Sequence, residues 1–434
     1  MRRFAASRFG LGVLVVAALV ALYGVAYVTR PAPRPPVEAQ PRKVPVEAAT
    51  ATCPAARGEK VSVYLPGTLS REPMNEAGPY TVNGPGGLEA GYITRTTSGA
   101  GRGLAGLRCA EPAAESWLVG PGPARGRVTL HLVNADKAPA FADVEVYAAE
   151  GQVSGDEGLG MEIAPGEHRR IDLRTLAAAA DVMAVSVTTF TGRLAVSARA
   201  ELETGGVDWL PTAAAPATEV VVPAVPGGGG RRELLVAAPG ETDATVRIKA
   251  VTEGAAYAMR GRESIDVPAG SVLPLDVTTG IGGESAALVL TSTAPVVAGV
   301  VITGTGRQPD VAFTAGTPAL DLGSAVAANG AGSRLVLTAP DGAGKVRVQV
   351  VPEGGEPRAA VEVAVPAGRT RDVRLAGEGA YAVLVTPVSG RVYGGRVVEE
   401  RLRTGVLITA QPLAPARLWT VLRPLTDTSR AVLP

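Results

Sequence analysis

The residue types that most often carry catalysis or bind metals are scarce in this chain of 434 residues, which has only two His and two Cys. His131 lies in an alternating run that predicts a strand, and His168 follows a Pro-Gly turn. No Gly-x-Ser-x-Gly nucleophile elbow occurs. So few His and Cys residues also exclude the usual metal clusters. We therefore expect no catalytic residues, no metal site, no cofactor and no enzymatic activity.

Acidic and glycine-rich segments hold the remaining candidates for chemistry. Asp156 and Glu157 could coordinate a hard cation, but calcium needs six to eight oxygens in a defined spacing, which this segment does not supply. The run Gly342–Lys345 is followed by Val346, where a phosphate-binding loop has Ser or Thr. Solvent-exposed turns are the expected setting of both segments.

Composition narrows the class of partner. With 42 Lys and Arg against 41 Asp and Glu, the net charge is +1, so no bulk field attracts a phosphate backbone. Aromatic residues make up only 4% of the chain, too few for base-stacking platforms. We therefore expect no nucleic-acid partner. The hydrophobic content of 46% excludes general disorder.

The amino terminus indicates where the chain resides. Arg2, Arg3 and Arg8 precede an uncharged run over Leu11–Val28, which as a helix would nearly span a bilayer core. Positive charge before the run favours a cytoplasmic amino terminus. We expect an uncleaved signal anchor and extracytoplasmic bulk, with secretion after signal cleavage as the alternative. A Pro-rich segment follows, which predicts an extended linker.

The two cysteines, Cys53 and Cys109, suit an exported protein. An oxidising compartment would allow them to form a disulfide. Closing the loop between them would stabilise the fold by about 4 kcal/mol on the chain-entropy model. Two free thiols are the alternative.

A repeat of about 100 residues recurs three times. Its markers are a Pro-Gly turn ending at Gly166, Gly270 and Gly368, and an upstream Glu-Gly pair. Within each copy, alternating apolar and polar residues predict short strands, and each copy is expected to close on a hairpin. The expected hairpins cover 183–202, 287–303 and 381–400.

This pattern predicts an all-β fold of three tandem immunoglobulin-like antiparallel β-sandwich modules. The expected domains are a signal anchor or transmembrane helix over 1–30, a Pro-rich linker over 31–52, a first module over 53–211 with a Cys-bridged insertion, a second module over 212–316 and a third module over 317–434.

Three motifs resemble a family of secreted or membrane-anchored actinobacterial proteins of unknown function. They are Cys109 with Trp117-Leu118-Val119-Gly120, Asn134, and the run Gly206-Val207-Asp208-Trp209-Leu210-Pro211. The resemblance covers most of residues 50–434 and implies an extracytoplasmic location, but it supplies no activity. The Ala, Gly, Arg and Val bias agrees with a high-GC genome.

We expect a membrane-anchored structural or interaction protein of the cell envelope that presents its modules to a protein partner. The Cys-bridged insertion, residues 53–109, is the expected contact surface, and replacing residues 68–105 by a short linker is expected to abolish partner binding while the other modules stay folded. Binding of cell-wall glycan is the alternative, with Tyr64, Tyr80 and Tyr92 as the aromatic platform. A hydrolase is the least favoured class.

Overall fold

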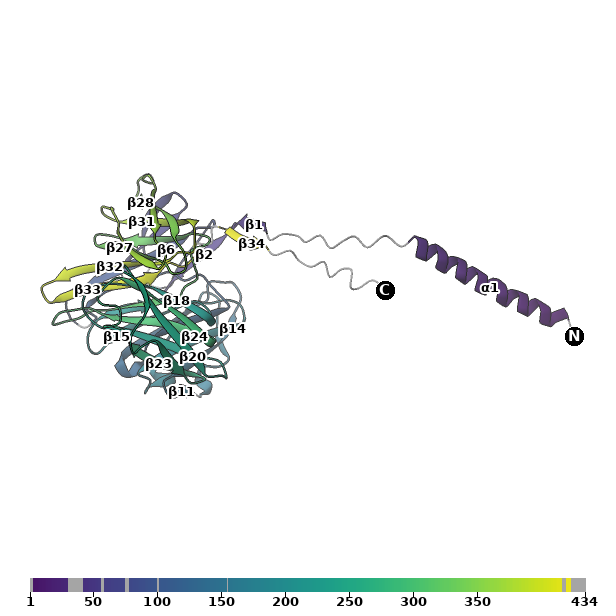
Figure 1. Ribbon diagram of the computed structural model, residues 1–434, viewed down its shortest axis with the longest axis horizontal. Helices are drawn as coiled ribbons and strands as arrows, with labels where there is room; N and C mark the ends of the chain where they lie inside the picture. The colour runs from purple at the N-terminus through teal and green to yellow at the C-terminus, as the bar shows by residue number, and fades with distance from the viewer. Residues whose placement is uncertain are drawn as a thin grey trace. The chain divides into compact units, whose positions relative to one another are not determined.

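The computed structural model of the protein describes residues 3–29, 42–55, 58–74, 78–99, 101–153, 155–415 and 419–422. The chain divides into two units, one of Met1–Val44 with Val421–Pro434 and one of Pro45–Thr420. Figure 1 labels α1 and some of the strands.

The first unit contains the helix α1, Arg3–Val28. Its segment Gly10–Val28 is long and apolar enough to cross a membrane, and none of that segment is buried against protein. Large side chains such as Leu14 and Leu22 are 70% and 68% exposed. A helix that is apolar all round suits a lipid surrounding rather than water. The predicted apolar helix is therefore confirmed.

Residues 31–41 of the expected linker lie outside the described residues. From Arg42 onward the chain forms strands instead of a continuous spacer. The first strand, β1 (Arg42–Pro45), pairs with β34 (Trp419–Leu422), and Ala49–Cys53 forms β2.

The second unit is all-β and sandwich-like, as the sequence predicts. It begins with what we call the N-terminal β-region, residues 49–110, which has two antiparallel sheets. The two-stranded sheet contains β2 and β5 (Tyr80–Gly84). The four-stranded sheet has the order β4 (Thr68–Pro73), β3 (Lys60–Leu65), β6 (Glu89–Thr96), β7 (Gly103–Arg108).

Three strand groups follow, each with two sheets, and an equivalent pairing order recurs in all three. In the first group, one sheet has the order β11 (Gly151–Gln152), β10 (Ala140–Ala148), β14 (Val182–Thr191), β8 (Glu115–Pro121), β17 (Thr212–Ala213), with β12 (Met161–Ile163) also on β10. The other has the order β13 (His168–Asp172), β9 (Gly126–Val133), β15 (Ala195–Leu202), β16 (Val207–Leu210). Its short helical turns are η1 (Pro123–Arg125), η2 (Asp156–Gly158) and α2 (Arg174–Ala177).

In the second group, the strand β24 (Ala286–Thr303) joins both sheets. The strands beside its first half, directly or through β20, are β18 (Ala217–Val225), β20 (Ala244–Thr252), β21 (Ala256–Ala258) and β22 (Ser264–Val267). Those beside its second half, directly or through β19, are β19 (Arg232–Ala238), β23 (Ser271–Asp276) and β25 (Val311–Ala315).

The third group has two four-stranded sheets. The first has the order β26 (Ser324–Asn329), β31 (Tyr381–Ser389), β28 (Gly344–Pro352), β29 (Val361–Val365). The second has the order β30 (Arg369–Arg374), β27 (Ser333–Ala339), β32 (Tyr393–Leu402), β33 (Gly405–Pro412).

The expected hairpins are wrong. The strands β14 and β15 lie in different sheets, as do β31 and β32, so each connection crosses between the layers. In the second group no turn forms at Ala294-Pro295, because the 18-residue strand β24 continues through both residues. Its Pro295 lies where β24 passes from one sheet to the other, a position where a missing N–H is tolerated. The domain boundaries expected from the sequence remain predictions.

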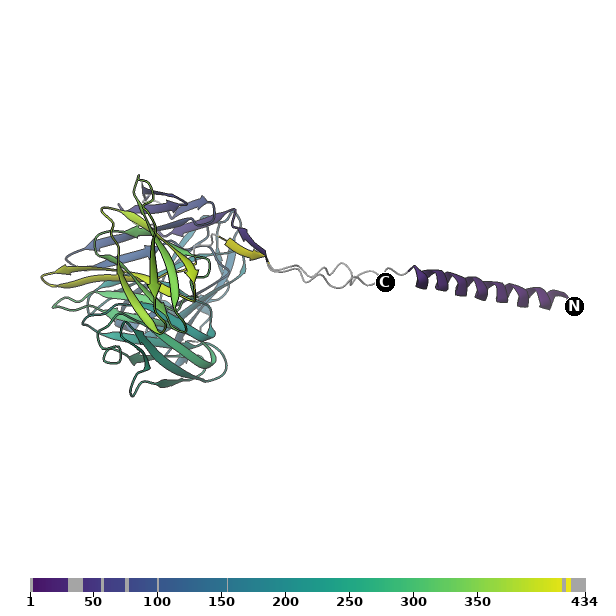
Figure 2. The ribbon, with the colours of Figure 1, turned by 45° about the horizontal axis from the view of Figure 1, so that its top comes forward.

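The strand groups share their hydrophobic cores. The core of the first group includes Leu235 and Phe313 of the second, and the core of the second includes Val336 and Ile408 of the third. In Figure 2, the yellow-green strands near the carboxyl end lie beside purple strands of the N-terminal β-region. There Tyr64 packs with residues of the third group. The N-terminal β-region thus packs against the last strand group as well as the first.

Candidate functional site

Four strands from distant parts of the chain meet at a buried polar junction. Asp208 in β16 is fully buried. Its Oδ1 accepts hydrogen bonds from the backbone N–H groups of Gly106 (2.9 Å) and Trp209 (2.8 Å). It also accepts a bond from the hydroxyl of Thr409 in β33, at 3.1 Å. One carboxylate therefore joins β7, β16 and β33.

A second carboxylate, Asp310, precedes β25 and is also fully buried. Its Oδ2 accepts from the backbone N–H groups of Leu104 and Ile408, each at 2.9 Å, and its Oδ1 accepts from that of Val207 at 3.2 Å. Burial raises the pKa of Asp310 to about 6, while the backbone N–H donors oppose that rise. The same strands are thus joined twice.

Behind these acids lies Arg396 of β32, with no exposed surface. Its Nη2 donates to Oε1 of Gln411 at 2.6 Å, and Nε2 of Gln411 donates to the carbonyl of Gly106 at 2.8 Å. Burial lowers the pKa of Arg396 to about 10, and nearby Asp208 opposes that effect. Burial also raises the pKa of Asp208. Within the described part of the chain, Nε and Nη1 of Arg396 and Oδ2 of Asp208 have no hydrogen-bond partner.

The backbone at Gly106 must come very close to this junction. A Cβ there would lie 2.7 Å from the Thr409 hydroxyl oxygen and 3.0 Å from Nη2 of Arg396. Any larger residue would push β7 away from β33, so glycine is required for the approach.

A pocket of about 290 Å³ lies next to the junction, with Gly106, Trp209 and Gln411 in its lining. The N-terminal β-region supplies one wall and the first strand group another. Its charged lining residues are Glu89, Arg108, Glu111 and Glu115. Arg108 forms an ion pair with the buried Glu89, with Nη2 and Oε2 2.6 Å apart. Burial raises the pKa of Glu89 to about 7, against the lowering effect of Arg108.

The two histidines of the chain contact each other beside this pocket wall. The distance between Nδ1 of His131 and Nε2 of His168 is 2.9 Å, and the rings stack. The ring of Trp209, which lines the pocket, lies 5.2 Å from that of His131. Burial lowers the pKa of His131 to about 3, and also lowers that of His168. The sequence gives no sign of this contact, because 36 residues separate the two histidines.

The expected tyrosine platform is wrong. Tyr64 and Tyr92 are only 3% and 2% exposed and pack in different clusters. Tyr80 is half-buried, and its hydroxyl donates to Oε2 of Glu72 at 2.6 Å. Because β strands rather than loops hold these side chains, their apolar rings fill the interior. The three residues therefore do not form a surface that could stack on a sugar.

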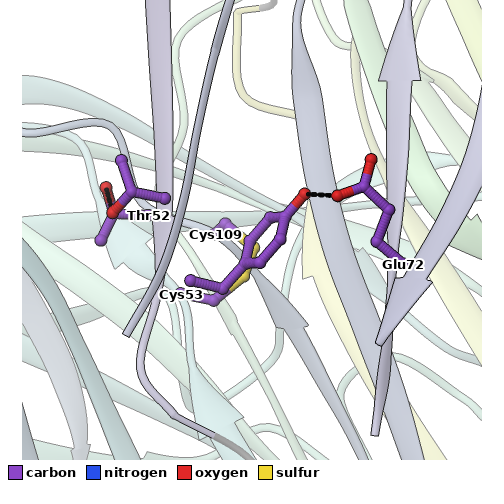
Figure 3. Close-up of a disulfide and its surroundings, with 6 residues drawn as sticks. Thr52, Cys53, Glu72 and Cys109 are labelled. Atoms are coloured by element: carbon purple, nitrogen blue, oxygen red, sulfur yellow. Dashed lines mark hydrogen bonds between the residues drawn. A yellow bond between two sulfur atoms is a disulfide. The ribbon is translucent and has the colours of Figure 1, made fainter. Parts of the chain in front are cut away.

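The disulfide between Cys53 and Cys109 is present, as expected (Figure 3). It links the end of β2 to the residue after β7, and both cysteines are buried. Glu72, which accepts the hydrogen bond from Tyr80, is labelled in the same view. Cys109 also lines the pocket, so the disulfide fixes part of its wall.

The chain belongs to a family of unknown function (DUF5719), whose sequence profile matches residues 80–376. No curated protein sequence matches it. Among solved structures, one of the Gx strain of infectious bursal disease virus is 11% identical over 93% of this chain and 90% of that chain. Its TM-score of 0.11 is too low to support an argument about fold.

The carboxylates of the junction join strands through backbone N–H donors. In the described ranges, no cluster of three or more His, Cys, Asp or Glu side chains could hold a metal ion. Of the junction residues, the motif Gly206–Pro211 marked Asp208 and Trp209 in advance. Asp310 and Arg396 carry no local sequence signal, because their partners lie far away in the chain.

Proposed function

We propose that the protein is a membrane-anchored, non-catalytic structural or interaction protein of the cell envelope, which presents its β-sandwich body to a protein partner. The observation that carries the proposal is the exposed apolar helix α1, with Arg2, Arg3 and Arg8 at its amino-terminal end. By the positive-inside rule, these arginines favour a cytoplasmic amino terminus and a β unit outside the membrane. The disulfide agrees with an oxidising compartment.

A non-catalytic role is supported by how the polar side chains are used. Oδ1 of Asp208 and both carboxylate oxygens of Asp310 accept hydrogen bonds from backbone N–H groups and so hold strands together. The imidazole of His131, whose pKa is lowered by burial, stacks on His168 and lies against the tilted ring of Trp209. The location in the cell envelope, the actinobacterial origin and the existence of a protein partner are parts of this proposal.

Membrane topology is the first test. The full chain, tagged at its carboxyl terminus, is produced in a bacterial host, and protease is added to cells stripped of their wall. We expect the tag and the β unit to be accessible from outside. Mass spectrometry of the amino terminus should find Arg2 and Arg3 retained by an uncleaved anchor. A tag protected in intact cells would contradict the proposal, and a mature chain beginning after Val28 would make the protein secreted.

Crosslinking of the full-length protein in its native envelope, followed by mass spectrometry, tests the partner. A reproducible protein partner supports the proposal. Capture of glycan-linked material alone would favour the alternative of cell-wall binding, which now lacks the expected tyrosine platform. Capture of neither would contradict both functions.

A further inference from the structure

We infer that the open edge of the third strand group binds an extended segment of the protein partner that carries aliphatic side chains and a carboxylate. This inference rests on the proposed function and names the chemistry of its contact. The edge lies between β29 and β30, the outermost strands of the two sheets, which a short turn connects. The apolar side chains there, which we call the apolar seam, are Val350, Val361, Val363, Val373 and Leu375.

The seam is less covered than the equivalent positions of the other two groups. Leu375 lies seven residues after the Pro-Gly turn of its repeat, as do Leu173 in the first group and Val277 in the second. Leu173 and Val277 have no exposed surface, whereas Leu375 is only partly buried against its core. Val361 is 63% exposed, although it pairs with the buried Val348 of β28. The third core therefore reaches the surface at this edge.

The connector that follows the edge strand accounts for this difference. Nine residues, 173–181, join β13 to β14, and their buried Ala177 lies in the core. Nine residues, 277–285, join β23 to β24, and Ile281 is buried in the same way. Only six residues, 375–380, join β30 to β31, and none of these six is buried. Two groups thus cover the edge with aliphatic side chains of their own chain, so aliphatic side chains of another chain would fit the corresponding place in the third.

The strand β29 also offers its backbone. It is the last strand of its sheet and, among the described residues, pairs only with β28. One row of its backbone N–H and C=O groups therefore has no neighbouring strand, and such edges bind extended peptides by strand addition. The one charge on β29, Glu362, faces away from the seam, with its carboxylate 3.3 Å from Nζ of Lys345 and 3.5 Å from Nη2 of Arg347. It leaves the apolar side of the strand open to a partner.

One guanidinium beside the seam has no partner within the described part of the chain. Arg371 of β30 is exposed, and it lies opposite Leu337 of β27, whose side chain is in the core. Arg371 therefore starts from the core-facing side of its strand, as Val373 does. The acids of the adjoining loops, Glu356 and Glu378, are exposed and form no ion pair with it. A carboxylate on the bound segment would pair with Arg371, and a basic residue would be repelled.

Binding of short peptides to the full-length protein in lipid nanodiscs tests the inference. The probe is capped Glu-Val-Thr-Ile-Thr-Val, whose aliphatic side chains alternate as in a strand. One comparison has Lys in place of Glu, and the other has Asn in place of the three aliphatic residues. We expect the probe to bind, the Lys peptide to bind at least threefold more weakly and the Asn peptide at least tenfold more weakly. Hydrogen exchange should slow in β29 on binding and stay unchanged in β22, an edge strand of the second group.

Three variants separate the seam from the rest of the surface. Val361→Asp places a charge in the seam at an exposed position and should weaken binding of the probe at least tenfold. The matched control is Val388→Asp, a valine of β31 that is 46% exposed outside the seam, which should bind like the natural protein. Arg371→Gln should remove the preference for the Glu peptide over the Lys peptide. Thermal unfolding checks that each variant folds.

Absence of binding, equal binding of the probe and the Asn peptide, or undiminished binding by folded Val361→Asp would overturn the inference. A preference for the Glu peptide that survives Arg371→Gln would overturn the part played by the carboxylate. These outcomes are distinct from failure of the proposed function. If crosslinking captures a protein partner from cells carrying Val361→Asp as efficiently as from natural cells, the proposed function stands and the seam is not the contact. If no partner is captured from natural cells, the proposed function fails whatever the peptides show.

Discussion

Asp310 shows how a single buried residue joins segments of several strand groups. Leu104, Val207 and Ile408 all donate backbone N–H groups to it. These donors cannot reach water and have no substitute acceptor when the carboxylate is removed. Buried polar groups without partners cost far more than an average hydrogen bond contributes.

Asp310→Ala should therefore lower the free energy of unfolding by about 3 kcal/mol or more, since each orphaned buried donor costs roughly 1–3 kcal/mol. Denaturant unfolding of the full-length protein measures this loss. The matched control is Asp341→Ala, whose carboxylate is exposed in a surface pair with Arg391, and which should change stability by less than about 0.5 kcal/mol. Similar losses for the two variants would show that the junction is not essential.

His131 predicts a sensitivity to acid. Its pKa is about 3 in the folded protein against 6.5 ordinarily, so below pH 6.5 the unfolded chain binds a proton that the folded chain excludes. Its contribution to stability is complete above that pH and is lost as the pH falls toward 3, by about 1.4 kcal/mol per pH unit.

The variant His131→Gln removes this titration. The stability of the natural protein relative to the variant should be constant above about pH 7 and should fall below pH 6. The difference isolates His131 from Glu89 and Asp310, whose raised pKa values act in the opposite direction. A pH-independent difference, measured by unfolding at each pH, would contradict the buried, neutral imidazole.

Among the elements, β2 and β7 owe their joint position to the disulfide. The adjacent bridge between Thr52 and Ala110 contains two backbone hydrogen bonds, of 2.8 and 2.9 Å, and continues the link. Replacing Cys53 and Cys109 together by Ser should lower the free energy of unfolding by about 4 kcal/mol on the chain-entropy model. Unfolding with and without reductant measures the effect. The double variant should be insensitive to reductant, and a loss below about 1 kcal/mol would contradict the expectation.

The sequence predicted strands well but their partners poorly. Alternation along Val144–Tyr147 and its counterparts in the other groups identifies a face that is buried, and the structure has strands β10, β20 and β28 there. Alternation does not say which strand lies alongside. Neighbouring strands were therefore expected to pair as hairpins, whereas β14 and β15 lie in different layers.

At the scale of the whole molecule, the N-terminal β-region is part of the common core. Tyr64 and Leu69 pack on Ala325 and Val351, and Leu104 packs on Leu407. The expectation that residues 68–105 form a replaceable insertion of binding loops is therefore wrong. Much of this segment is strand β4, β5 and β6, and its apolar side chains cover the third strand group.

Replacing residues 68–105 by a short linker should consequently destabilise the third strand group, because apolar surface on β26 and β28 becomes exposed to water. Hydrogen exchange of the full-length variant should show at least tenfold faster exchange in these strands than in the natural protein. Strand β20 of the second group, whose core lacks residues of the N-terminal β-region, serves as the internal control. Unchanged protection of β26 would contradict this interpretation.

The candidate site could be predicted only in part, because most of its contacts join strands that lie far apart in the sequence. Two of its residues lie in a short motif, Gly206–Pro211, but the pocket requires Glu89 and Gln411 to be brought to that motif. Such contacts depend on packing between remote strands, and no local pattern encodes them. The helix α1 follows from its own local sequence, in which basic residues precede a long apolar run. The sequence therefore predicts it without any contact to a remote strand.

The contact between Gly106 and Gln411 spans 305 residues, which sets an order of events during biosynthesis. At about 5–20 residues per second, β33 leaves the ribosome roughly 15 to 60 s after β7. Throughout that interval the half-formed body carries an uncovered apolar face and, at Gly106, a backbone carbonyl that lacks its donor. A nascent chain of this kind is vulnerable to aggregation and to proteases until its last strands arrive. The contact that β33 makes with Gly106 therefore completes the junction only when the last strands of the body have been synthesised.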